Sequence, residues 1–63
     1  MAYYQCFKTL ERDVYCSSYK VKNHDEGADW VRQALAHFSL QASDIKGKPY
    51  EANNIPEGAI TYP

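Results

Sequence analysis

Two runs of strand-forming residues, separated by three charged ones, most restrict how this chain can fold. Residues 2–10 and 14–22 are rich in aromatic, β-branched, Thr and Cys side chains, with polar residues between them and no Gly or Pro. Both runs are typical of β-strands. The connection Glu11-Arg12-Asp13 is short, and Asp13 tolerates the left-handed backbone that closes a three-residue hairpin loop. The sequence therefore predicts an antiparallel β-hairpin.

This loop fixes a register in which the numbers of opposed residues sum to 24. Side chains alternate between the two faces of a hairpin, so a one-residue slip would change how the faces combine. The expected core face carries Tyr3, Phe7, Thr9, Tyr15, Ser17, Tyr19 and Val21. The other face is expected to be a mixed surface that carries Tyr4, Cys6, Lys8, Leu10, Val14, Cys16, Ser18, Lys20 and Lys22.

The two cysteines, Cys6 and Cys16, both lie in the predicted hairpin. Their spacing matches no zinc or redox motif, and two cysteines are too few for the disulfide framework of small secreted domains. We expect free buried thiols. A disulfide across the hairpin is the geometric alternative.

An amphipathic helix is predicted over residues 25–38. Asp25 and Glu26 suit the positive end of the helix dipole, and Asn23 or Asp25 can cap the free amides. The apolar stripe follows helical spacing through Val31, Ala34, Leu35 and Phe38, with Trp30 at its edge. The outer side is expected to carry Asp29, Arg32, Gln33, Ala36 and His37.

The remaining residues, 41–63, are dominated by turns and short extended pieces. Pro56-Glu57-Gly58 predicts a type II turn, residues 59–62 alternate as an edge strand does, and Ile45 is a candidate for a short third strand. The expected architecture is one α+β domain over residues 1–63, with a hairpin packed on one helix and one or two further strands in the order ββαβ.

Composition bears on compartment. The chain shows no signal-peptide pattern and no apolar stretch long enough to span a bilayer. We therefore expect a cytoplasmic protein without membrane association, located in the host cell if the chain is phage-encoded.

No group of residues predicts catalysis. Cys6, Cys16, His24 and His37 are present without a signature around them, and His37 is expected to face outward. A metal site would draw on His24, Asp25, Asp29 or His37, but the spacing favours a cap and a turn residue instead. Lys46-Gly47-Lys48 lacks the glycines of a phosphate loop. We expect no enzyme activity, no metal and no cofactor.

Nucleic-acid binding is the main chemical alternative. Single-strand binders stack bases on sheet aromatics and attract phosphates with lysines. The rings and lysines available for such a face are Tyr3, Tyr4, Phe7, Tyr15, Tyr19, Lys8, Lys20 and Lys22. A net charge of −1 and the absence of a characteristic RNA-binding motif argue against this alternative.

Binding to a larger protein or complex is the favoured class. Tyrosines, a tryptophan and open sheet edges are the groups that anchor interfaces. The expected partner-binding residues are Tyr4, Lys8, Lys20, Lys22, Glu26, Asp29 and Tyr50, and the tail with Ile55 and Tyr62 offers further contacts. Self-association into a homodimer is a third hypothesis, because the core is thin and sheet edges pair readily.

The chain is very small, rich in aromatics and without a catalytic signature. In this general character it resembles the inhibitors that phages and mobile elements direct against host complexes, anti-CRISPR proteins among them. The resemblance covers no specific motif. It implies binding and inhibition and names no target.

Overall fold

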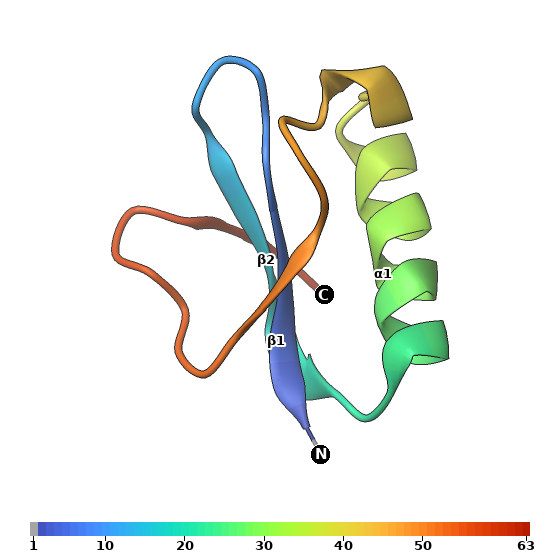
Figure 1. Ribbon diagram of the computed structural model, residues 1–63, viewed down its shortest axis with the longest axis vertical. Helices are drawn as coiled ribbons and strands as arrows, with labels where there is room; N and C mark the ends of the chain where they lie inside the picture. Colours follow the sequence, from blue (N-terminus) through green and yellow to red (C-terminus); the bar gives the residue numbers. More distant parts are fainter. Residues whose placement is uncertain (1) are drawn as a thin grey trace.

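A four-stranded sheet covered by one helix makes up the computed structural model, which describes residues 2–63 (Figure 1). The elements in chain order are β1 (Tyr3–Lys8), β2 (Val14–Val21), α1 (His24–His37), the 3₁₀ turn η1 (Ala42–Asp44), β3 (Tyr50–Ala52) and β4 (Ile60–Tyr62). The predicted α+β architecture is confirmed, with two C-terminal strands and the order ββαββ.

The order of strands across the sheet is β3-β1-β2-β4. β1 is antiparallel to both β2 and β3, while β4 is parallel to β2. β3 and β4 therefore lie at opposite edges, and the connection 53–59 has to cross one face of the sheet. Figure 1 shows this connection on the side of the sheet away from α1. β1 and β2 thus have α1 on one side and this connection on the other.

The hairpin loop lies one residue earlier than predicted. Thr9 and Asp13 close it, because the Thr9 amide donates to the Asp13 carbonyl (2.9 Å) and the Asp13 amide donates to Thr9 Oγ1 (3.2 Å). Arg12, with φ 70°, takes the left-handed position that we had assigned to Asp13. The loop is therefore residues 10–12, a turn followed by one left-handed residue.

The register changes once along the hairpin. Tyr3 pairs with Val21 and Tyr4 with Lys20, as predicted, but beyond a bulge Cys6 pairs with Cys16 rather than Ser18. Since this shift is two residues, it preserves which side chains face the helix.

The bulge itself explains the one misplaced core residue. Ser17 is fully buried and fills the gap, since Ser17 Oγ accepts from the Gln5 amide (3.0 Å) and donates to the Tyr19 carbonyl (2.6 Å). Tyr19 lies in the bulged segment and is 42% exposed, so its placement in the core was wrong.

Cys6 and Cys16 form a disulfide, and the expectation of free thiols was wrong. The two residues are direct cross-strand partners with a Cα–Cα distance of 4.1 Å, a separation typical of pairs that share no backbone hydrogen bond. Neither residue has any exposed surface. This face of the sheet, opposite the helix, is therefore partly interior and not the open mixed surface that we predicted.

Aromatic side chains build the core between sheet and helix. The Phe7 ring stacks on Tyr15 (5.1 Å between centroids) and meets Trp30 (5.7 Å). Trp30 is 1% exposed, and its Nε1 donates to the Tyr62 carbonyl (2.7 Å), which ties α1 to β4.

The buried stripe of α1 is rotated from the predicted one. Its centre is Gly27, Trp30 and Ala34, while the predicted members Val31, Leu35 and Phe38 are only half-buried. A Cβ at Gly27 would collide with the Gln5 side-chain oxygen, so glycine permits the close approach of the helix to β1.

Both ends of α1 are capped. Asn23 Oδ1 accepts from the Glu26 amide (2.9 Å), which confirms one of the two predicted caps. At the other end Ser39 adopts φ 57°, and the Leu40 amide donates to the Leu35 carbonyl (2.8 Å). This is the glycine-type helix stop with serine in the left-handed position.

The C-terminal segment agrees with most of its predictions. Gly58 has the positive φ (84°) that a type II turn requires, and the Ala59 amide donates to the Pro56 carbonyl (3.2 Å). β4 is the predicted edge strand, whereas Ile45 forms only a single bridge, to Thr9.

Removing the disulfide should weaken the fold markedly. Closing a loop over a sequence separation of 10 residues corresponds to about 3 kcal/mol of unfolded-state entropy. We expect the Cys6→Ala/Cys16→Ala variant to lose about 2–3 kcal/mol in a urea titration, with Ser18→Ala as the control. Two thiols reacting with a maleimide in the denatured, unreduced protein would contradict the assignment.

Arg12 and Ser39 adopt the left-handed backbone conformation although they are not glycine, so substitution there should stabilise the fold. Glycine removes the Cβ clash of the left-handed region, so Arg12→Gly and Ser39→Gly should each raise the free energy of unfolding by about 1 kcal/mol. Thermal unfolding measures this as a rise of roughly 4–8 °C per variant. Ser43→Gly, in a right-handed 3₁₀ turn, is the matched control and should not stabilise; equal gains at Ser39 and Ser43 would refute the explanation.

Candidate functional site

The predicted partner-binding residues divide between two sides of the molecule. One face of the sheet carries Cys6 and Cys16, and we call it the disulfide face. It also carries Tyr4, Lys8, Lys20 and Tyr50, because Lys20 pairs with Tyr4, and Tyr50 with Cys6. The Lys20 ammonium lies 5.7 Å from the centroid of the Tyr4 ring.

The other predicted residues lie elsewhere. Lys22 is exposed between β2 and α1, while Glu26 (half-buried) and Asp29 (exposed) belong to the helix. Asp29 pairs with Arg32. The structure therefore does not bring the seven residues into one site.

The aromatic platform considered for nucleic acid is also divided. Tyr3, Phe7 and Tyr15 are buried in the core beneath α1. Tyr4 lies on the opposite face, and Tyr19 projects from the bulge. No single sheet face of residues 2–63 displays all five rings.

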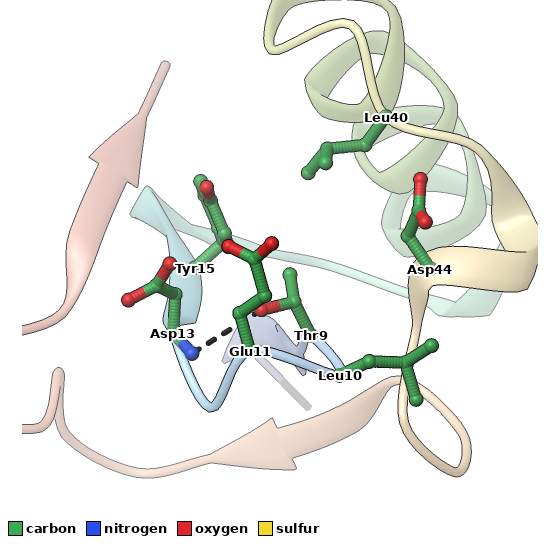
Figure 2. A pocket seen from close by; sticks show the side chains of 7 residues that line it. All are labelled: Thr9, Leu10, Glu11, Asp13, Tyr15, Leu40 and Asp44. Carbon is green, nitrogen blue, oxygen red and sulfur yellow. Dashed lines mark hydrogen bonds between the residues drawn. The ribbon is translucent and has the colours of Figure 1, made fainter.

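One hollow, of about 220 Å³, lies at the hairpin end (Figure 2). Figure 2 shows Glu11 in the hairpin loop and Asp13 at its end, with Leu40 and Asp44 from the segment after the helix. Burial raises the pKa of Tyr15, and the charges of Asp13 and Glu11 raise it further. Three carboxylates, those of Glu11, Asp13 and Asp44, line this hollow, which is therefore acidic.

A second and larger hollow is a groove of about 620 Å³ between α1 and residues 42–49. We call it the helix groove. Its apolar lining consists of Ala28, Val31, Leu35, Ala42, Ile45 and Pro49. Its polar and charged lining consists of Gln5, His24, Arg32 and Lys48. No carboxylate of residues 2–63 lines it.

A small polar cluster lies at one end of the helix groove. The Tyr3 hydroxyl is 3.5 Å from His24 Nδ1, which is 3.8 Å from Glu51 Oε2. Burial raises the pKa of Tyr3, and the Glu51 charge adds to that shift. Gln5 Nε2 donates to the Tyr50 carbonyl (3.1 Å) close by, so the cluster also holds β3 against β1.

In the part of the chain that the structure describes, no three His, Cys, Asp or Glu side chains are grouped so as to hold a metal ion. Within residues 2–63, no helix is both long and apolar enough to cross a membrane.

Comparison with protein-family models, with curated proteins and with solved structures finds no match to this chain. The site is therefore defined by its own geometry.

Sequence reasoning did not find the helix groove. Val31 and Leu35 were assigned to the core, and the turn-rich segment of Ile45 and Pro49 was assigned no surface role. The missing signal was the rotation of the helix stripe toward Trp30, which leaves Val31 and Leu35 half-exposed. A stripe centred on Trp30 in the sequence would have predicted that Val31 and Leu35 lie at its edge.

Alkaline pH should destabilise the fold through Tyr15. Its pKa in the folded protein is raised above the ordinary tyrosine value of about 10. The neutral hydroxyl is thus favoured in the folded state. Its contribution to the free energy of unfolding is complete below pH 10 and is lost as the pH rises above 10. In urea titrations between pH 8 and 11.5, Tyr15→Phe should lose less stability than the wild type.

Tyr19→Phe, an exposed position on the same strand, controls for loss of a hydroxyl. Identical alkaline losses in Tyr15→Phe and in the wild type would show that Tyr15 does not carry the effect.

Proposed function

We propose that this protein is a non-enzymatic binding protein that docks on a larger protein or complex and modulates or inhibits it by occupying a surface. The observation that carries the proposal is the set of large apolar side chains left exposed by so small a domain. Their exposed fractions are 62% for Leu10, 42% for Tyr19, 38% for Tyr50, 36% for Ile55 and 38% for Ile60. Apolar and aromatic groups of this kind form the centres of protein interfaces.

The rest of the surface supports the same class of function. The helix groove adds a separate apolar, concave area to the surface. Protein partners recognise such grooves by inserting apolar side chains into them.

Inhibition in the manner of small phage-encoded inhibitors such as anti-CRISPR proteins is part of the proposal and is supported by size and composition alone. We further propose that the protein acts in the cytoplasm, of the host cell if it is phage-encoded. Disulfides are rare there, but full burial of Cys6 and Cys16 shields this one from thiols, because exchange requires access to sulfur.

Affinity capture tests the proposed function. The full oxidised chain, immobilised through an added C-terminal tag, is exposed to lysate of the native host, and retained proteins are quantified by mass spectrometry. We expect one protein or complex to be retained, and purified partner to bind with 1:1 stoichiometry in calorimetry. Retention of none, or equal retention on an unrelated domain of the same size, would refute the proposal.

Self-association is a second candidate, favoured by the sheet edges. β3 and β4 are three-residue edge strands with free outer backbone groups, and Ile60 of β4 is exposed. Light scattering over a concentration series decides it, since a monomeric mass at every concentration excludes a homodimer. A salt-dependent mobility shift of single-stranded DNA would instead favour nucleic-acid binding.

A further inference from the structure

The helix groove has an aliphatic floor. Val31 and Leu35 of α1 face Ile45 across it, and all three are half-buried side chains that pack on the core from one side and line the groove with the other. An occupant that inserts aliphatic side chains would complete their burial, which is favourable in proportion to the apolar area removed from water.

Both charged side chains that line the groove are cations, while two carboxylates, those of Asp29 and Glu51, lie next to lining residues. Arg32 and Lys48 are the charged side chains among its lining residues, with His24 at one end. Lys48 has no ion-pair partner within residues 2–63. Arg32 pairs with Asp29 on the exposed helix surface, where such a pair contributes little and exchanges readily for another carboxylate.

The lining also indicates which anionic partner fits. Nucleic-acid sites for single strands stack bases on Phe, Tyr or Trp rings. The groove, as formed by residues 2–63, is lined by none of these rings. Aliphatic side chains beside cations are complementary to a helical protein segment that carries both aliphatic residues and carboxylates.

We propose that the helix groove binds an acidic, aliphatic segment of the partner protein, with its aliphatic side chains on Val31, Leu35 and Ile45 and its carboxylates on Arg32 and Lys48. This inference rests on the proposed function, since it names the part of the surface that docks and the chemistry of the partner.

The test uses two helical probe peptides of twelve residues. One combines leucine with glutamate at i, i+3 and i+4 spacing, and the other has lysine in place of each glutamate. Each is titrated into the full, oxidised, ¹⁵N-labelled chain and followed by amide chemical shifts. We expect the glutamate peptide to shift amides of residues 28–35 and 42–49 and to bind at least tenfold more tightly than the lysine peptide.

Ala28→Glu and Ala36→Glu are matched variants. Both alanines are exposed on α1, but only Ala28 lines the groove. We expect Ala28→Glu to weaken binding of the glutamate peptide at least tenfold and Ala36→Glu to change it less than twofold. Lys48→Glu, in a loop outside the helix, should weaken binding of the glutamate peptide about threefold or more. This variant replaces Ala28→Glu in the test if Ala28→Glu does not fold.

Several outcomes would overturn the inference. These are equal affinity for the two peptides, equal affinity of the Ala28→Glu and Ala36→Glu variants, and shifts confined to the disulfide face. Shifts of groove amides on concentrating the protein alone would identify a second copy as the occupant and would also overturn it.

The same variants separate this inference from the proposed function. If the wild type and Ala28→Glu retain the native partner equally, the groove is not the docking site, although the proposed function stands. If the wild type retains no partner, the proposed function fails whatever the peptides do. Loss of the native partner by Ala28→Glu, but not by Ala36→Glu, supports both.

Discussion

The disulfide between Cys6 and Cys16 joins the two central strands at the point where their register changes. Every other element is positioned by these strands. β3 pairs with β1, β4 pairs with β2, and the helix packs on Phe7 and Tyr15 from the facing side. A slip between β1 and β2 would therefore displace both edges and the core together. In a domain with so small a core, a covalent link at this position restricts the alternative pairings that a two-residue bulge would otherwise permit.

Trp30 links the helix to the sheet, as the disulfide links the two central strands. Its ring contacts Phe7 in the sheet, and its indole nitrogen donates to the carbonyl of Tyr62 in β4. A three-residue parallel edge strand has few hydrogen bonds of its own, so this bond from the helix contributes to holding β4 in place. The rings of His37 and Tyr62 stack at 4.6 Å and close the same corner. Much of the aromatic content of the chain thus serves the core.

Local signals in the sequence were enough for the hairpin, the helix and the type II turn. Asn23, Gly58 and the alternation in β1 each act through backbone preferences of their own segment. The errors arose where a distant or side-chain interaction decides the outcome. Thr9 moves the hairpin loop by one residue through its hydroxyl, and Ser17 stabilises a bulge that no periodicity reveals. The disulfide was given only as the alternative to free thiols, and the predicted register did not place Cys6 opposite Cys16, which the bulge does.

The helix groove is also a feature that distant interactions decide, because two separate segments form it. It lies between two segments, α1 and residues 42–49, whose relative position depends on the direction of β3 and on the Thr9–Ile45 bridge. Gly27 packs against the Gln5 side chain of β1, and the helix is oriented so that its buried stripe is centred on Trp30 while Val31 and Leu35 stay half-exposed. The surface best suited to binding is thus a consequence of how the core is packed. A substitution that rotated α1, by enlarging Gly27, would alter the groove without touching any residue that lines its aliphatic floor.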